Sequence, residues 1–338
     1  MARMLVDSGD FVEAYDYIKR AINEGGCDDK DSDQIICYST LATICTELMG
    51  IGDGTTYYTE AVNAFEKVIQ FREKNLGKHH ADTAVAYHDY AYFWYVCGVY
   101  DKALIYNEMA NTIEKELFSE HSITRMRNLN TKALIIWEQG DIKQANDIFD
   151  YIIAESEKMS DDYLIDVAQF EFNYARCLHY QGNDDRAKEY YGKCIAIWTQ
   201  MSNAGNRNHA LAHQERADIL FSEGNAPDAL KDYEKAKKYI TEDFYVFVDI
   251  MDSMAACLIL CHRVDEGISM FKELLKFLVE YNATDAETKY QLCNNLFCIL
   301  DAASDEEVEW KKKLMEQIEG NADIIEYVDN YLPNEQEK

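Results

Sequence analysis

The sequence predicts an all-α protein, a solenoid in which antiparallel helix pairs stack one after another along the chain. Small residues recur at a fixed step of 42 positions over the middle of the chain. The three recurring series are Gly98, Gly140, Gly182 and Gly224; Ala103, Ala145, Ala187 and Ala229; and Ala91, Ala133, Ala175 and Ala217. A fixed period of this size is typical of a repeat array. Only two prolines interrupt the 338 residues, and no strand-like alternation of apolar and polar residues breaks the pattern.

The small residues have one physical cause. Two antiparallel helices approach to about 8–10 Å where the side chains at their crossing are small. We therefore place one alanine of each pair on each helix, twelve residues apart, and expect the glycine between them to end the first helix in a left-handed turn. Large apolar residues then fill the space between successive pairs; they include Phe93, Trp94, Ile135, Ile136 and Leu178.

The first pair starts at the beginning of the chain. Ala2 precedes Ala14 by twelve residues, so part of the first helix of this pair is missing. We expect either a clipped helix or a chain that is the C-terminal part of a longer protein. In both cases the end of the array lacks a neighbour, and its uncovered side is a possible surface for self-association.

The second pair, Ala42 and Ala61, has a spacing of nineteen, and the surplus falls on the glycine-rich stretch from Gly50 to Thr56. We interpret this stretch as a turn between two helices. A phosphate-binding loop is the alternative, but the stretch has no Gly-Lys-Ser/Thr ending and no strand before it.

The next four pairs are regular. Pro227 lies two residues before Ala229, in the first helical turn, where its missing N–H costs nothing. The last pair places Ala255 against Gly267, again twelve residues apart.

These spacings divide the chain into two regions. Residues 1–280 form the array, about seven helix pairs. Residues 281–338 are expected to provide C-terminal capping helices and a short acidic tail, because the last pair of an array needs a polar-faced neighbour. The expected capping helices are residues 285–300, 306–318 and 322–331.

Charge and cysteine content limit the classes of partner and the compartment. The chain has 62 acidic and 33 basic side chains, a formal charge of −29, which argues against nucleic acid or an anionic membrane as partner and favours a neutral or partly basic one. The ten cysteines include no Cys-x-x-Cys pair and fit free thiols in a reducing compartment. With no signal peptide and no run of 18 apolar residues, we expect a cytoplasmic protein.

The repeat unit resembles the tetratricopeptide repeat. The residues that carry the resemblance are Ala91, Gly98-Val-Tyr-Asp-Lys-Ala103 and Ala110. The long period, together with the linker Leu76-Gly-Lys-His-His80, is similar to the kinesin light-chain variety, although Ala81 stands where that linker has proline. Over roughly residues 2–275 the resemblance implies a right-handed superhelix with the first helix of each pair on its concave side, usually a surface for holding proteins or peptides.

A stripe of first-helix residues is the candidate binding surface. Counted from the first alanine of each pair, the stripe occupies positions −6, −3, −2, +1, +4 and +5, one helical face. Its candidate binding residues are His88, Asp89, Tyr92, Tyr95, Arg127, Asn130, Trp137, Phe172, Asn173, Arg176, His179, Glu215 and Asp218. The asparagines can bond an extended peptide backbone, and the aromatic residues can form pockets. Charge is segregated along the stripe, with Arg127 and Arg176 in the middle and Glu215 and Asp218 toward its later end. The same residue types also occupy ordinary solvated and inter-helix positions.

Catalytic and metal motifs are weak by comparison. His209 and His213 lie four residues apart, but no third metal ligand has matching spacing. We assign Cys257 and Cys261 to the core, and the His79–His80 pair to helix capping or the surface. No nucleophile elbow, phosphate loop or dinucleotide fingerprint occurs, so we expect neither catalysis nor a cofactor.

The sequence therefore predicts a non-enzymatic scaffold that binds a protein or peptide on its concave face. The alternative is a ligand-sensing or regulatory region of a larger signalling protein whose N-terminal effector part is absent from this chain. The missing half-helix before Ala2 favours that alternative.

Overall fold

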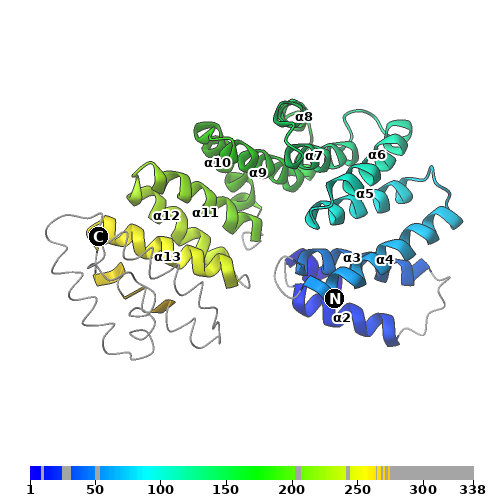
Figure 1. Ribbon diagram of the computed structural model, residues 1–338, viewed down its shortest axis with the longest axis horizontal. Coiled ribbons are helices and arrows are strands. Elements are labelled where there is room, and N and C mark those ends of the chain that lie inside the picture. Colours follow the sequence, from blue (N-terminus) through cyan, green and yellow to red (C-terminus); the bar gives the residue numbers. More distant parts are fainter. Residues whose placement is uncertain are drawn as a thin grey trace, which may run out of the picture. The chain divides into compact units, whose positions relative to one another are not determined.

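The computed structural model describes residues 1–8, 11–24, 32–49, 54–201, 207–240, 244–263, 265–267, 269–270 and 273–274. These residues contain helices and turns and no strand (Figure 1). The helices are α1 (Ala2–Ser8), α2 (Phe11–Glu24), α3 (Ser32–Leu48), α4 (Gly54–Asn75), α5 (Ala81–Val96), α6 (Tyr100–Leu117), α7 (Ile123–Glu138), α8 (Ile142–Ser156), the short 3-10 turn Asp161–Tyr163, α9 (Leu164–Tyr180), α10 (Asp184–Gln200), α11 (Arg207–Ser222), α12 (Ala226–Tyr239) and α13 (Phe244–Leu260). The all-α prediction is confirmed.

The chain forms two compact units. The first contains Met1–His213 and Tyr239–Phe244, and the second contains Gln214–Lys238 and the chain from Tyr245 onward. The candidate surface lies mainly in the first unit. The expected capping helices after residue 281 and the centre of the glycine-rich stretch, residues 50–53, fall outside the described residues.

The predicted register of the helix pairs agrees with the packing. Within the first unit, α3 packs on α4, α5 on α6, α7 on α8, and α9 on α10. The crossing alanines are inaccessible to solvent, with 0% exposure at Ala42, Ala61, Ala91, Ala103, Ala133, Ala145, Ala175 and Ala187. Ala217 and Ala229 of the next pair are also 0% exposed. A methyl group is thus the largest side chain that these crossings accommodate without separating the helices.

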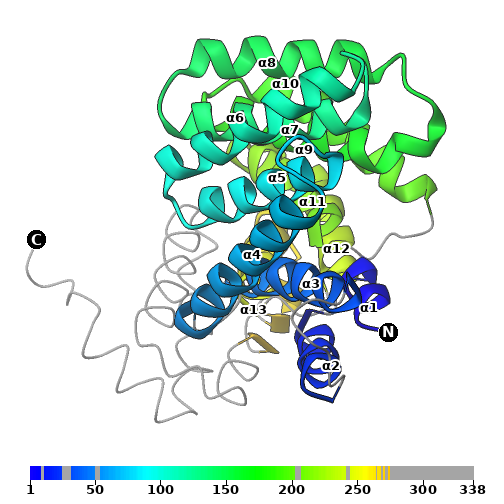
Figure 2. The same cartoon turned by 90° about the vertical axis from the view of Figure 1, so that its right-hand side faces the viewer.

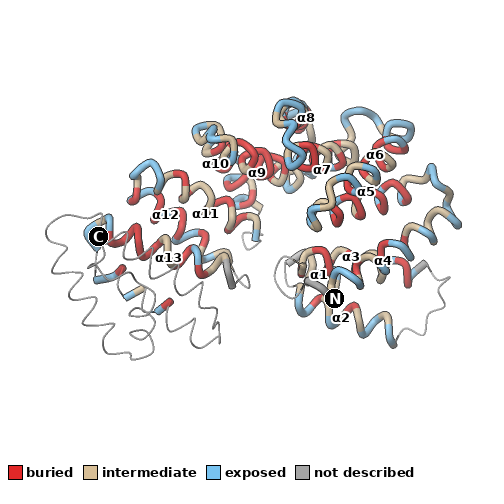
Figure 3. The backbone as a smooth tube through the Cα atoms, viewed as in Figure 1, coloured by how far each residue is buried: buried red, intermediate tan, exposed pale blue. Residues whose placement is uncertain are grey.

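The first helices of successive pairs form one layer. Helix α3 contacts α5, α5 contacts α7, and α7 contacts α9, so we call α3, α5, α7 and α9 the first-helix layer. Helices α6, α8 and α10 lie along its other side (Figures 1 and 2). Figure 3 shows the buried stretches between the two layers, which include the predicted filler residues Phe93, Trp94, Ile135, Ile136 and Leu178 at 5% exposure or less.

The helix ends show why the glycines recur. Gly98 has a φ of +71°, its N–H bonds to the Tyr95 carbonyl at 2.9 Å, and the Val99 N–H bonds to the Trp94 carbonyl at 2.9 Å. This paired closure needs a left-handed residue. In the second unit His262 has the same role with a φ of 60°, and the following Arg263 N–H bonds to the Leu258 carbonyl at 2.9 Å.

The last described pair crosses at a glycine. A Cβ placed on Gly267 would lie 2.7 Å from Cγ1 of Ile259 and 2.8 Å from the Ala255 carbonyl oxygen. Gly267 therefore approaches α13 more closely than an alanine allows, which agrees with the predicted pairing of Ala255 with Gly267.

The short polar segment before α5 caps that helix. The His80 imidazole accepts a hydrogen bond from the Asp82 N–H at 3.1 Å, while the exposed His79 ring lies 3.0 Å from a carboxylate oxygen of Glu116. The prediction of a capping or surface role for these histidines agrees with these contacts. In the described part of the chain no helix is both long and apolar enough to cross a membrane.

A candidate binding surface on the first-helix layer

Residues from three successive first helices enclose a pocket of about 170 Å³, which we call the aromatic pocket. Its lining consists of Tyr95 from α5; Leu134, Trp137 and Glu138 from α7; and Arg176, Cys177 and Tyr180 from α9. All but Cys177 occupy positions +1, +4 or +5 after the first alanine of their own repeat. The period of the sequence and the direct packing of α5, α7 and α9 therefore bring equivalent positions together.

The pocket has an apolar floor and aromatic walls. Leu134 is 8% exposed and Cys177 is 2% exposed, so both belong to the core. The rings of Trp137 and Tyr180 lie 5.6 Å apart, centroid to centroid, at 45°, and Tyr180 is exposed. The indole N–H of Trp137 is shielded from solvent and has no hydrogen-bond acceptor among the described residues.

Two opposite charges lie at the pocket. The exposed Glu138 accepts a hydrogen bond from the Tyr100 hydroxyl at 3.1 Å. The guanidinium group of Arg176 comes from the neighbouring helix. Burial, with a further contribution from Glu138, raises the pKa of Tyr95, and Arg176 opposes that rise. The tyrosine therefore stays a neutral hydroxyl that can donate or accept a hydrogen bond.

Tyr92 lies next to this region, also on α5. Its ring lies 6.1 Å from that of Tyr95. The carboxylate of Glu47 raises the pKa of Tyr92, burial adds to the rise, and Arg207 and Arg176 oppose it. Both acidic and basic groups therefore act on these tyrosines.

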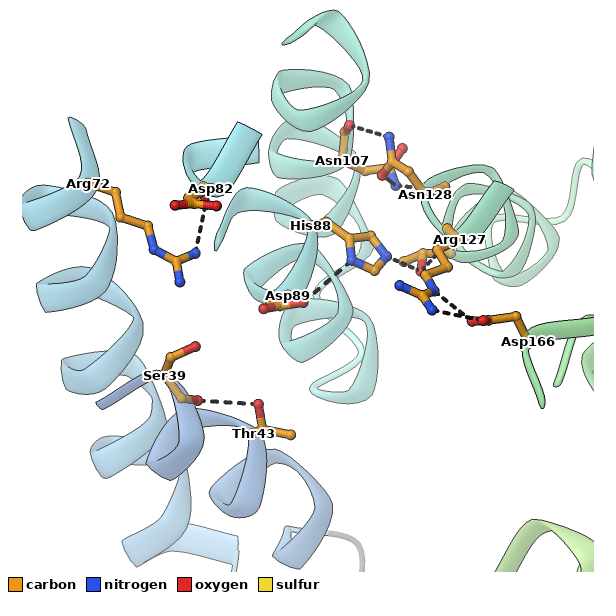
Figure 4. A network of polar contacts seen from close by, with 11 residues as sticks. Ser39, Thr43, Arg72, Asp82, His88, Asp89, Asn107, Arg127, Asn128 and Asp166 are labelled. Carbon is orange, nitrogen blue, oxygen red and sulfur yellow. Dashed lines mark hydrogen bonds and ion pairs between the residues drawn. The ribbon is translucent and has the colours of Figure 1, made fainter. Parts of the chain in front are cut away.

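The N-terminal halves of the same helices are tied together by polar bonds (Figure 4). Arg127 of α7 donates two hydrogen bonds to Asp166 of α9, at 2.6 and 2.8 Å, and this pairing raises the pKa of Arg127. His88 of α5 lies 3.1 Å from the Thr131 hydroxyl of α7 and 3.5 Å from Asp89. The guanidinium group of Arg127 is therefore already paired with a carboxylate of the neighbouring first helix.

The two asparagines expected to hold a peptide backbone are bonded to each other. Nδ2 of Asn173 donates to Oδ1 of Asn130 at 3.2 Å, and Asn173 accepts from Gln169 at 3.0 Å. Asn208 of α11 continues this chain of amides by donating to Gln169 at 2.7 Å. Both asparagines are 8% exposed. Their amides thus connect α7, α9 and α11.

The polar bonds between first helices recur at fixed positions of the repeat. The prediction of one solvent-facing stripe did not take this recurrence into account. His88–Thr131 and Asn130–Asn173 both join position −3 of one repeat to position −2 of the next, 43 residues on. A second set of ties, Arg127–Asp166 and Gln169–Asn208, spans 39 residues in each case. Positions −6, −3 and −2 therefore lie at the contact between neighbouring first helices.

Phe172 differs most from its expected place. It is 2% exposed, and its ring packs against Tyr191 at 6.2 Å and Trp198 at 5.8 Å, both on α10. At position −3 the apolar ring of Phe172 packs on the partner helix α10, whereas the polar side chains of His88 and Asn130 at the same position bond to the next repeat. Phe172 is a core residue in this structure rather than a surface anchor.

The pocket lining does not include the remaining predicted residues. The His179 imidazole lies 2.7 Å from Asp184, in the first turn of α10. Glu215 and Asp218 belong to the second unit, where Asp218 accepts a hydrogen bond from the Tyr233 hydroxyl.

The histidine pair His209 and His213 is buried, at 0% and 1% exposure. Tyr239 stacks on His209 with ring centroids 4.2 Å apart, so the pair packs against an aromatic ring. Within the described ranges no three His, Cys, Asp or Glu side chains are grouped to hold a metal ion.

A larger pocket, of about 400 Å³, lies between α3 and α4. Among the described residues its lining consists of Ile35, Tyr38, Lys67, Gln70, Phe71, Lys74 and Asn75. The Lys67 ammonium already donates to the Tyr38 hydroxyl at 2.9 Å and lies over its ring. Because its described lining comes from a single helix pair, this pocket is not formed by equivalent positions of successive repeats.

Comparisons with known proteins agree with the fold. Two family models, both described as "Tetratricopeptide repeat", match residues 57–82 and 170–197; the second match lies within the α9–α10 pair. No curated protein sequence matches this chain.

Solved structures share the architecture at low sequence identity. The apo form of the quorum sensor NprR from B. thuringiensis matches with a TM-score of 0.60 and 11% identity, over 93% of this chain and 84% of that chain. A STAND signal transduction ATPase from Pyrococcus horikoshii, with a tetratricopeptide repeat sensor, gives 0.56 and 14%, over 94% of this chain and 51% of that one. Kinesin light chain TPR-like repeats from Podosopora anserina give 0.51 and 14%, over 60% of this chain and 98% of that one. At these identities the comparisons establish the fold.

Proposed function

We propose that this chain, a tetratricopeptide-repeat protein, is a non-enzymatic scaffold that holds a peptide, or an extended segment of another protein, against its first-helix layer. The observation that carries the proposal is the aromatic pocket, because three different repeats contribute to it. A surface that spans several repeats suits a chain-like ligand, and aromatic side chains with arginine are the usual anchors of binding surfaces.

The order of the first-helix layer supports this role. Polar ties hold α5, α7, α9 and α11 in register at their N-terminal halves. The C-terminal halves carry the pocket, whose shape is therefore set before a ligand arrives. A preformed site avoids much of the ordering cost of binding.

The partner is expected to be neutral or partly basic overall. With a net charge of −29, the chain attracts basic segments and repels acidic ones at distances short enough that salt does not screen the interaction between charges. Binding should therefore weaken moderately as salt concentration rises.

The experiment selects random linear peptides from a display library on the purified full chain, and then measures the selected peptides by calorimetry. The pocket variants are Trp137→Ala and Tyr180→Ala. The matched control is Tyr151→Ala, an aromatic residue of α8 that is 39% exposed. We expect the pocket variants to lose tenfold or more in affinity, since a binding anchor contributes about 2 kcal/mol or more. Peptides that bind the pocket variants and the wild type equally would place the site elsewhere.

The second candidate is a ligand-sensing region of a signalling protein. Its support is the fold likeness to a quorum sensor and to a sensor part of a signal transduction ATPase. In that case ligand binding should alter hydrogen exchange in repeats that do not line the pocket. Exchange that changes only in α5, α7 and α9 would favour the plain scaffold.

A further inference from the structure

We infer that the aromatic pocket receives one large, uncharged apolar side chain of the bound segment, and that the backbone of this ligand residue lies between Glu138 and Arg176. The inference rests on the proposed function, since it specifies the ligand class for the same pocket. It concerns side-chain selectivity, which the fold alone does not determine.

The size of the pocket limits its occupant. Pockets for whole drug-sized ligands measure about 300–1,000 Å³, whereas this one measures about 170 Å³. An engineered cavity of about 150 Å³ holds a benzene ring. One phenylalanine, leucine or methionine side chain therefore matches the available space, and a complete small molecule does not.

The chemistry of the lining selects an apolar group. Leu134 and Cys177 at the floor offer no strong hydrogen-bonding group. Tyr95, Trp137 and Tyr180 surround the space with ring surface, against which an apolar side chain loses its contact with water. Transfer of such a side chain from water is the main favourable contribution available here.

The two charges disfavour a charged occupant. A charged side chain of either sign would be repelled by one of these groups and attracted by the other, so it would gain little to offset its lost hydration. A neutral side chain meets neither repulsion. The peptide unit of the ligand residue fits both groups, because its N–H can donate to Glu138 and its carbonyl can accept from Arg176. A guanidinium carries five N–H donors, so Arg176 can serve a ligand carbonyl in addition to its contacts within the chain.

Aromatic walls also suit cations in some proteins, where rings surround an ammonium or guanidinium group. If the pocket bound a cation in this way, it would prefer an arginine or lysine side chain to an apolar one. A set of probes that share one backbone and differ only in the side chain separates the two.

The probes are the N-acetyl amides of phenylalanine, leucine, arginine and glycine. Each is titrated into the ¹⁵N-labelled full chain while the indole N–H resonance of Trp137 is followed by NMR. The chain has four tryptophans, and Trp137→Phe identifies the resonance. At the ligand efficiency of drug-sized molecules we expect a Kd on the order of 1 mM for the phenylalanine probe.

We expect the phenylalanine and leucine probes to bind at least about tenfold more tightly than the glycine probe, and the arginine probe to bind no more tightly than glycine. Tyr180→Ala should reduce the preference for phenylalanine, whereas Tyr151→Ala should leave it unchanged. The inference is overturned if arginine binds most tightly, if phenylalanine and glycine bind alike, or if no probe shifts the resonance at about 20 mM.

The peptides from the display selection separate this inference from the proposed function. If they bind at the pocket but tolerate replacement of every apolar residue by glutamine, the selectivity inference is wrong and the scaffold proposal stands. If they bind pocket variants and wild type alike, the scaffold proposal itself fails.

Discussion

Replacing Glu114 by glutamine should stabilise the protein at pH 8 and have much less effect at pH 5. Glu114 lies in α6 at 1% exposure, and in the described part of the chain neither carboxylate oxygen has a hydrogen-bond partner of normal geometry. Burial raises its pKa to about 7, although His88, Asn128 and Arg125 lie near enough to oppose the shift. A glutamine keeps the shape of the side chain and cannot ionise.

The pH dependence of stability follows from the difference in the pKa of Glu114 between the folded and the unfolded protein. The ordinary pKa of the group is 4.5 and its folded value is about 7, so folding favours the protonated acid. Its contribution to stability is fully present below about pH 4.5 and is lost as the pH rises through 7. With these two pKa values, ionisation of Glu114 lowers the free energy of unfolding by about 2.5 kcal/mol between pH 5 and pH 8.

Urea unfolding followed by circular dichroism at the two pH values measures this difference. The free-energy advantage of Glu114→Gln over wild type should grow by about 2.5 kcal/mol from pH 5 to pH 8. The control is Glu66→Gln, an exposed glutamate of α4, which removes the same negative charge and should change stability by less than about 0.5 kcal/mol. An advantage of Glu114→Gln that is the same at both pH values would refute the assignment of a buried, protonated acid.

Three further predictions concern the repeat. Ala145→Leu should destabilise the protein by about 1–3 kcal/mol through overpacking, because Ala145 is 0% exposed at a helix crossing; a neutral effect in thermal unfolding would contradict the register. His262→Gly should stabilise it by about 1 kcal/mol, since a non-glycine residue is strained at a φ of 60°, and a lower melting temperature would count against this cap. Asn173→Ala should cost about 1–3 kcal/mol by removing the donor to Oδ1 of Asn130 and the acceptor for Nε2 of Gln169; if unfolding is unchanged while peptide binding is lost, Asn173 is a ligand contact.

The periodic small residues made the fold predictable from the sequence. An alanine at a crossing and a glycine at a helix end are selected by local geometry that repeats every 42 residues, so one repeat predicts the next. The exception at His262 was not predicted, because nothing in the sequence says that a histidine takes the left-handed position.

The surface was predicted less completely, and the reason is geometric. A helical face was defined within one repeat, whereas burial depends also on the neighbouring repeat. Position −3 holds a partly buried His88, an 8% exposed Asn130 and a 2% exposed Phe172. The rotation between successive pairs decides which part of the stripe faces solvent, and that rotation is not encoded in any single spacing.

The stripe therefore has two halves with different roles. Toward the N-terminal ends of the first helices, stripe positions −3 and −2 bond to each other across 43 residues. Stripe position −6 bonds across 39 residues to position −9 of the next repeat, which lies outside the stripe. Toward the C-terminal ends, positions +1, +4 and +5 line the aromatic pocket. A polar bond is directional, so each tie fixes how far one helix is shifted along its neighbour. Because the same helices carry both halves, any shift at the ties would also displace the pocket walls. Loss of a tie such as Arg127–Asp166 should therefore weaken peptide binding although neither residue lines the pocket.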